Sequence, residues 1–274
     1  MEYTKFQQSV IEAIKDCKSE IKNCCENALL HLEKAWLLKD IDKEMAVFRG
    51  ITAEEEAAIA VFFCLKQHQY NNADKLQFKQ HPTKLGLYPF LRHIGNHLAG
   101  TLFSESSPFE NHRLKLVEVT GRKALEIVFK IKGHNLDARP LPPLHFNILN
   151  HNTGEIQTYD IDFRNMYLGD NYKDSLKYIE EVANQRNRLL YANSAGKPKV
   201  DGDIEKYLNL QKMKVFLFIY IVLLIDPWEK EEGSSGFVQQ SLDSYLLLLN
   251  KIQKEDVIKA QQGISADPAT ASVR

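Results

Sequence analysis

The chain has 274 residues, with 35 Lys and Arg against 36 Asp and Glu, and 44% of its residues are hydrophobic. A chain of this length buries about three quarters of its surface on folding, so it needs neither a disulfide nor a metal to stabilise a core. The formal charge of -1 excludes a globally basic nucleic-acid-binding protein, although it leaves room for a local basic groove. The hydrophobic content also excludes an intrinsically disordered chain.

The N-terminus, the apolar segments and the cysteines together favour a cytoplasmic protein. The first six residues mix charged and polar side chains and contain no apolar stretch, so they are not a signal peptide. The longest apolar run, from Val215 to Ile225, has about half of the ~20 residues that a membrane-spanning helix needs. The four cysteines form no Cys-x-x-Cys pair and lie in segments of apolar periodicity, as buried, reduced thiols do. The sequence therefore predicts a cytoplasmic chain with a buried core helix and no membrane segment.

Helical periodicity dominates the first hundred residues. Apolar residues recur every three or four positions from residue 6 to about residue 47, which predicts a helix with a break near residues 39–42. Gly50 is expected to separate this helix from the next. Thr52 followed by Glu55 then fits a capping box, in which two side chains accept hydrogen bonds from backbone N–H groups of the first turn.

The middle of the chain changes to the alternation typical of strands. In residues 124–132, Leu125, Ile127, Phe129 and Ile131 fall on one face and Glu126 falls mainly on the other. Residues 114–119 precede this strand across Thr120-Gly121-Arg122, which predicts a hairpin. A second hairpin is expected to join residues 144–149 to residues 156–163.

The fold class that follows is mainly α, a helical bundle with a small antiparallel β insertion of two hairpins. We expect a first helical part over residues 1–110, the β insertion over 111–170, a second helical part over 171–262 that packs on the first, and a disordered tail over 263–274. Within these parts, periodicity predicts helices at 89–103, 173–192, 203–225 and 238–261, and a loop at 229–236.

Glu54 is the acidic residue that stands out. On helical spacing it aligns with Ala57, Ala58, Val61 and Leu65, so its carboxylate faces the apolar side of its helix. A buried carboxylate needs a cation or several hydrogen-bond donors, because burying it without partners is unfavourable. Both a structural ion pair and a place in an active or ligand site satisfy this requirement.

Arg186 is a candidate cation for such a pair. It falls inside the apolar stripe of the helix at 173–192, and a polar row beside it contains Glu181, Asn184, Arg188 and Tyr191. This arrangement suggests the edge of a cleft. The alternative is an arginine whose stem packs on the core while its head reaches solvent. Pairing of Glu54 with Arg186 is a hypothesis at this stage.

The segment from Arg92 to His97 offers a different chemistry. His93 and His97 are four residues apart, so a helix places them on one face, with a spacing that can bind a transition metal. A third ligand would have to come from another histidine or a glutamate. No Gly-x-Ser-x-Gly, Walker-type or Gly-x-Gly-x-x-Gly motif occurs, which argues against triad hydrolases, P-loop enzymes and Rossmann oxidoreductases.

Two segments resemble a known pattern. The HEPN group of helical proteins, which includes abortive-infection toxins and antiviral ribonucleases, carries an Arg, usually a polar residue next, and a His four to six positions after the Arg. The segment RHIGNH, with Arg92 and His97, fits this spacing, whereas RNRLLY, from Arg186, has Tyr191 at the position of the His. The segment TAEEEAAIAVFF, which contains Glu54, also resembles the Glu-containing helix of the abortive-infection members. The resemblance covers residues 1–103 and 173–261.

The resemblance implies a metal-independent endoribonuclease toxin in phage defence that uses no cofactor. Arg92 and His97 would stabilise charge on the reacting phosphodiester and protonate it, often across a symmetric homodimer. The other candidate site for cleavage is Glu54, Arg186, Arg188 and Tyr191. With a tyrosine in the place of the histidine, a site that only binds RNA or a nucleotide is the alternative there. The expected partner is a second copy of the chain or a defence-system protein. The alternative function is a non-catalytic nucleotide- or protein-binding scaffold whose Glu and Arg residues form structural ion pairs.

Overall fold

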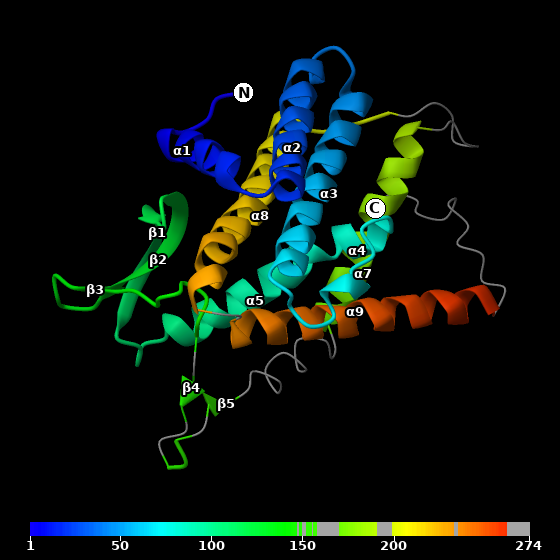
Figure 1. Cartoon of the computed structure of the whole chain (residues 1–274). Helices are drawn as coiled ribbons and strands as arrows, with labels where there is room; N and C mark the ends of the chain where they lie inside the picture. Colours follow the sequence, from blue (N-terminus) through cyan, green and yellow to red (C-terminus); the bar gives the residue numbers. More distant parts are fainter. Residues whose placement is uncertain are drawn as a thin grey trace.

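The computed structural model describes residues 1–146, 148–149, 152–154, 156–157, 170–190, 199–232 and 235–261. Helices dominate it, and a small antiparallel sheet lies at one side of the bundle (Figure 1). The predicted class, a helical bundle with a small β insertion, is confirmed. The predicted tail at 263–274 lies outside the described residues.

The first half of the bundle consists of a helical hairpin preceded by a short helix. Helix α1 spans Lys5–Ala13, a 3₁₀ turn follows at Ile14–Asp16, and α2 spans Ser19–Leu38. The longer α3, Lys43–Gln67, returns alongside α2. The predicted break near residues 39–42 is therefore confirmed. A second break, before α2, comes from Cys17, whose extended backbone ends the 3₁₀ turn.

The predicted start of a helix at Thr52 is wrong, because α3 begins ten residues or so earlier with Asp42 as its N-cap. Gly50 lies inside α3, where an added Cβ would come within 3.0 Å of a ring carbon of Tyr207. The glycine thus serves close helix packing and does not end the helix. Thr52 donates its hydroxyl to a carbonyl one turn earlier, and Glu55 is buried in an ion pair, so neither caps a helix.

Apart from the 3₁₀ turn at residues 73–75 and the short helix at residues 81–85, which the sequence did not predict, the remaining helices follow the predicted periodicity with shifted ends. A 3₁₀ turn lies at Ala73–Lys75, and the α-helices are α4 (His81–Leu85), α5 (Leu87–Leu102), α7 (Asp170–Leu190), α8 (Ile204–Glu232) and α9 (Gly236–Gln261). The loop predicted at 229–236 is wrong over 229–232, where α8 continues beyond Pro227. Contacts of Asp226 and Trp228 with the sheet hold this end of α8 in place.

The sheet forms as predicted around its first hairpin. Strands β1 (Phe109–Val119) and β2 (Arg122–Ile131) pair antiparallel through Thr120 and Gly121, both with positive φ, as two-residue hairpin turns require. The short β3 (Asp137–Ala138), which the sequence did not reveal, adds to β2. The second hairpin pairs β4 (Ile148–Leu149) with β5 (Ile156–Gln157), and residues 158–163 lie outside the described part.

One residue of strand β2 that was expected to be exposed to solvent is buried. Glu126, predicted to face outward, is 2% exposed. Lys115 approaches its carboxylate at 3.7 Å and Arg139 at 3.4 Å. Both faces of the first half of β2 are therefore covered, which a strict alternation of polar and apolar residues does not reveal.

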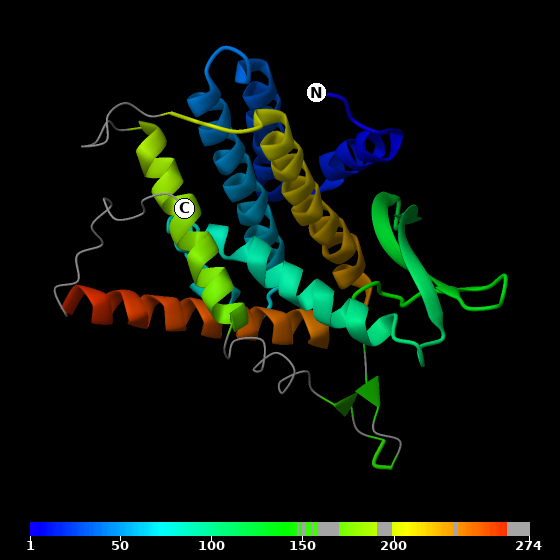
Figure 2. The same cartoon turned by 180° about the vertical axis from the view of Figure 1, so that it is seen from behind.

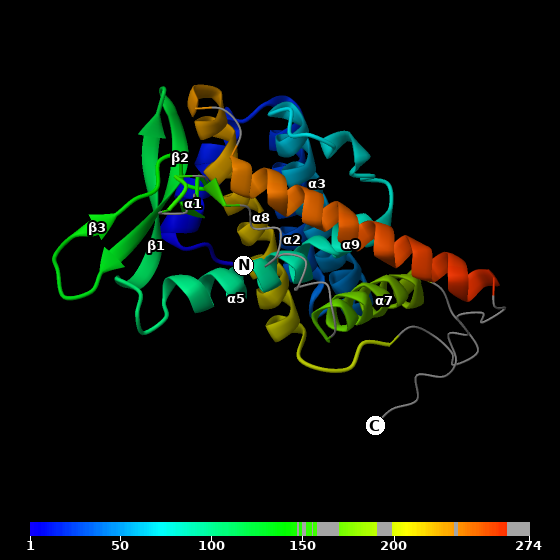
Figure 3. The same cartoon turned by 90° about the horizontal axis from the view of Figure 1, so that it is seen from below.

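A continuous apolar core joins the helices from both halves of the chain. Figures 1 and 2 show α2, α3 and α8 side by side, with α7 along the opposite side of the bundle from the sheet. Helix α9 crosses the ends of α3 and α8, as the view from below shows (Figure 3). The two helical parts thus share one interior.

Helix α8 is the central apolar element. Within the described residues it contains a stretch, Ile204–Trp228, that is long and apolar enough to cross a membrane by length and composition alone. In the most apolar window of that stretch, 61% of the residues are buried inside the protein, and core helices of soluble proteins meet the same criterion. The predicted role of Val215 to Ile225 as a core helix agrees with their burial.

Asp226 joins the sheet to the bundle. Its carboxylate is fully buried and accepts hydrogen bonds from Gln67 at 2.8 Å and from the Nη2 of Arg122 at the hairpin turn, and its Oδ1 lies 2.9 Å from the Nε2 of His68. Burial by itself raises the pKa of Asp226, but the bonds to His68 and Arg122 outweigh it, so the pKa lies below its ordinary value. The folded state therefore favours the ionised carboxylate.

Asp226→Asn is expected to reduce the free energy of unfolding by about 3 kcal/mol at pH 7, because it removes the charge that compensates Arg122. The lowered pKa means that this contribution is fully present above the pKa of the unfolded chain and disappears as the pH falls through that of the folded state. Urea denaturation at pH 7 and at successively lower pH measures the difference.

Asp201→Asn is the matched control, because the ion pair that Asp201 forms with Lys199 in the described part of the chain is exposed. It should leave stability unchanged at both ends of the pH range. A difference between wild type and Asp226→Asn that stays constant down to the lowest pH at which the protein folds would contradict this role.

Candidate functional site

Glu54 forms a buried ion pair with a lysine of another helix, and a third helix donates a hydrogen bond to it. Its side chain on α3 is 0% exposed, and its Oε2 lies 2.7 Å from the Nζ of Lys214 on α8, a residue 2% exposed. The hydroxyl of Tyr178 on α7 donates to the Oε1 of Glu54 at 2.8 Å. Lys214 also donates to the Tyr178 oxygen. Both carboxylate oxygens are thus satisfied, as burial of a charge requires.

Two aromatic rings enclose the ammonium group of Lys214. Its Nζ lies 4.8 Å from the ring centroid of Tyr88 on α5 and 4.8 Å from that of Tyr178. The two rings are 5.9 Å apart, centroid to centroid. A cation over an aromatic face is attracted by the ring quadrupole, and the attraction is larger in a desolvated site. We name Glu54, Lys214, Tyr88 and Tyr178 the Glu54 cluster.

The phenols of the cluster are held in their protonated form. Burial and the charge of Glu54 raise the pKa of Tyr178 far above its ordinary value. Burial also raises the pKa of Tyr88, with Glu54 adding to the effect and Arg92 opposing it. At neutral pH these tyrosines are therefore hydrogen-bond donors and not bases.

Arg92 lies at the solvent side of this cluster. It is exposed and stands one helical turn after Tyr88 on α5, close enough for its charge to act on that phenol. Among the described residues no ion pair involves Arg92. His97, half-buried and five residues further along α5, points away at a different angle of the helix. The two residues of the predicted motif thus share a helix but not one face.

The second predicted motif lies on α7. The guanidinium carbon of Arg186, a half-buried residue, lies 5.2 Å from the ring centroid of Phe48 on α3. The hypothesis that Arg186 pairs with Glu54 is wrong, because the cation that meets Glu54 is Lys214. Arg188 is exposed, and Tyr191 lies outside the described residues. Arg186 therefore packs its guanidinium against an aromatic ring and does not form a closed Glu–Arg site.

A second buried carboxylate lies next to the first on α3. The Oε1 of Glu55 lies 2.6 Å from the Nδ1 of His81, and its Oε2 accepts from Lys84 at 2.8 Å. Both partners belong to α4. The glutamates thus face different neighbours, and Glu55 ties α4 to the bundle.

Two other chemistries find little geometry to support them in the described part of the chain. No three His, Cys, Asp or Glu side chains converge there in a way that could hold a metal ion, so His93 and His97 are not extended to a ligand set. Burial and the neighbouring Asp226 raise the pKa of Cys17 to about 12, and burial raises that of Cys24 to about 11. Neither thiol forms an appreciable thiolate at neutral pH, and the thiolate is the nucleophilic form.

Sequence reasoning missed Lys214, Tyr178 and Asp226. Lys214 directly precedes the apolar run of α8 and stands one turn before the buried Phe218. Helical spacing could therefore have predicted that Lys214 lies on the core face of α8. Asp226 likewise closes that run. The pairing of Glu54 with Lys214 could not be predicted from the sequence, because the two residues are separated by 160 positions.

Comparisons with known proteins add no relative. No family model, no curated protein and no solved structure matches the chain. The resemblance to HEPN proteins therefore stays a prediction that rests on short segments, and function has to be argued from the side chains themselves.

Glu54→Gln and Lys214→Met are each expected to reduce the free energy of unfolding by about 3–5 kcal/mol, because each leaves the other charge buried and uncompensated. The double variant should be more stable than the sum of the single effects predicts, by about 2 kcal/mol, since it contains no unpaired charge. Guanidinium denaturation of the wild type, the two single variants and the double variant gives the coupling free energy of this double-mutant cycle.

Lys177→Met serves as the control, because the Lys177–Glu181 pair on α7 is exposed and 3.9 Å long. It should not change stability measurably. Additive effects of the two cluster substitutions would show that Glu54 and Lys214 do not depend on each other.

Proposed function

We propose that the chain is a cytoplasmic, HEPN-like protein that acts on RNA, with Arg92 and His97 of α5 as the residues that meet the phosphodiester. The observation that supports the proposal most is the state of Arg92, an exposed guanidinium that no ion pair engages among the described residues. A guanidinium with free N–H groups binds phosphate in two-pronged fashion. His97 supplies an imidazole, the side chain that most often serves as a general acid or base.

The chemistry proposed for this pair is simple. Arg92 would neutralise charge that develops on the phosphate oxygens, and His97 would donate a proton to the leaving oxygen or take one from the attacking group. Because the two residues lie at different angles on α5, one RNA strand must reach both by crossing the helix. A second copy of the chain would supply the complementary pair, as the resemblance implies for a homodimer.

Glu54 takes a positioning role in this proposal. Its network with Lys214 and Tyr178 holds the start of α5 through the Tyr88 ring, one turn before Arg92. Glu54 itself is fully buried and has no route to an RNA strand. Arg188, which is exposed on α7, is a further phosphate-binding candidate, whereas Arg186 packs on Phe48.

The alternative function is a non-catalytic scaffold that binds a nucleotide or a partner protein. One observation favours it. The most conspicuous polar side chains of the interior, those of Glu54, Glu55 and Asp226, are all engaged in ion pairs or hydrogen bonds with protein groups. In this role the charged residues stabilise the fold, and the activity lies in binding alone.

Purified protein with a 5′-labelled single-stranded RNA tests the proposal directly. His97→Ala is expected to lower the cleavage rate about 100-fold or more while RNA binding persists, because it removes a proton-transfer group. Arg92→Ala is expected to weaken binding about tenfold, as the loss of a phosphate contact does. Cleavage is read on denaturing gels and affinity by fluorescence anisotropy.

Arg113→Ala is the matched control, because Arg113 is an exposed arginine of β1 paired with Asp137. It should change neither quantity. Binding without cleavage, unaffected by His97→Ala, would favour the scaffold. If the wild-type protein neither binds nor cleaves RNA, and its induced expression leaves bacterial growth and total RNA intact, the proposed function is wrong.

A further inference from the structure

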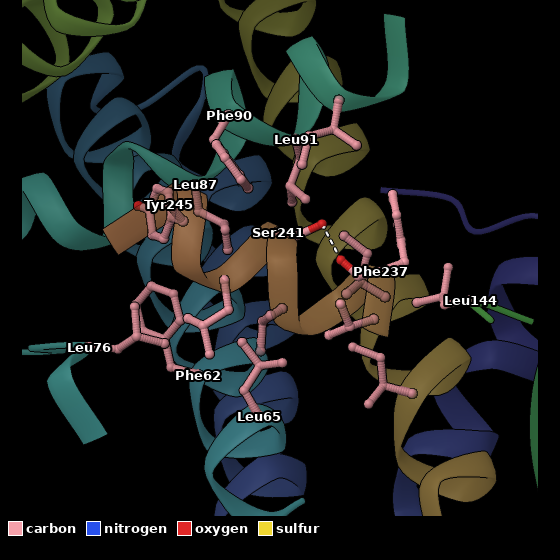
Figure 4. A pocket seen from close by; sticks show the side chains of 16 residues that line it. Phe62, Leu65, Leu76, Leu87, Phe90, Leu91, Leu144, Phe237, Ser241 and Tyr245 are labelled. Carbon is pink, nitrogen blue, oxygen red and sulfur yellow. Dashed lines mark hydrogen bonds between the residues drawn. The ribbon is translucent and has the colours of Figure 1, made fainter. Parts of the chain in front are cut away.

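An apolar cavity lies where α3, α5, α8 and α9 meet. Its volume is about 120 Å³, and sixteen side chains line it, from these four helices together with Leu76 and Leu144 (Figure 4). Helix α9 passes along it, so the cavity belongs to the junction between the two helical parts. It is separate from the exposed side of α5 that carries Arg92.

The lining presents no polar surface to the cavity. Ser241 donates its hydroxyl to the carbonyl of Phe237 at 2.8 Å, as the dashed line in Figure 4 shows. The hydroxyl of Tyr245 donates to the carbonyl of Thr83. Each lining hydroxyl is thus engaged by backbone, and a water molecule in the cavity would lack the two or more partners that it needs.

Such a cavity favours a hydrocarbon guest. A cavity of about 150 Å³ lined by Leu, Ile and Phe stays dry and binds benzene. The present cavity has a similar volume and lining and opens partly to the surface, so a guest can enter it, and a hydrocarbon guest gains dispersion contacts with its walls. The guest therefore has about six carbon atoms and no polar atom in the part that enters.

The half-buried residues of the lining indicate where the cavity meets the surface and how a guest would be oriented. Most lining residues are buried, but Leu91, Leu144, Ile221 and Ser241 are half-buried, so the cavity approaches the surface beside them. Leu144 is held there by Ser235, whose hydroxyl donates to the Leu144 carbonyl at 2.6 Å. A polar head could remain at this rim while the apolar end is inside.

We infer that this cavity is a binding site for a small apolar group, an aromatic ring or the end of an alkyl chain of about six carbons. The inference does not depend on the proposed action on RNA. Binding stabilises the native state, because the cavity exists only when the four helices are packed together. Leu87, Leu91 and Ile94 of α5 line the cavity, so occupancy also supports the helix that carries Arg92 and His97.

The experiment uses the full chain with benzene and with n-hexanol, which separate an aromatic from an alkyl guest. A probe that binds, present at ten times its dissociation constant, should raise Tm by roughly 3 °C and release heat in a calorimetric titration. Val238→Phe on α9 and Val61→Leu on α3 add carbon atoms to the cavity from two directions. Each is expected to weaken binding at least tenfold.

Leu37→Ala is the control for non-specific adsorption, because Leu37 is an apolar residue of α2 that is 74% exposed and remote from the cavity lining. It should bind both probes as the wild type does. If Val238→Phe fails to fold, Val61→Leu still tests the inference, because it adds only a single methylene group to the core.

Absence of a Tm shift and of heat with both probes at their solubility limits would overturn the inference. Undiminished binding by folded Val61→Leu and Val238→Phe would overturn it as well, because the probes would then bind elsewhere. Neither result bears on RNA cleavage, which is measured without these probes.

Discussion

The ion pair between Glu54 and Lys214 is the interaction on which the helical bundle depends. Taking two charges out of water is unfavourable, and only close contact together with further hydrogen bonds offsets that penalty. Here the contact is 2.7 Å, Tyr178 donates to the carboxylate and the Tyr88 ring covers the ammonium. The pair joins α3 to α8 and brings α5 and α7 to the same point, so four helices share one polar centre.

The same device recurs at the edges of the bundle. Asp226 joins the hairpin turn of the sheet to α8, Glu55 joins α4 to α3, and Glu126 binds basic residues from two neighbouring segments. Each carboxylate selects one arrangement, because any other packing would leave a buried charge without its partner. The apolar cavity lies where α3, α5, α8 and α9 meet, and its lining exposes no polar surface. Polar pairs thus fix the arrangement, and the cavity marks the place where packing is incomplete.

Periodicity predicted most helices and the first hairpin, because the burial of a face is a local property of the sequence. It failed at Gly50, because the close approach of Tyr207 is a contact between residues far apart in the sequence. It also failed at residues 229–232, where contacts with the sheet prolong α8. The candidate site was predicted only in part. That Glu54 faces inward was correct, but its partner came from another helix, and spacing along one chain cannot identify contacts between distant segments.

Hydrogen exchange measured by mass spectrometry on wild type and Lys214→Met tests the central role of the pair most directly. If four helices depend on it, Lys214→Met should reduce protection in α7 and in the first turns of α5, as well as in α3 and α8, while α2 keeps more of its protection. Reduced protection confined to α8 would contradict this account, because Lys214 would then act only on its own helix.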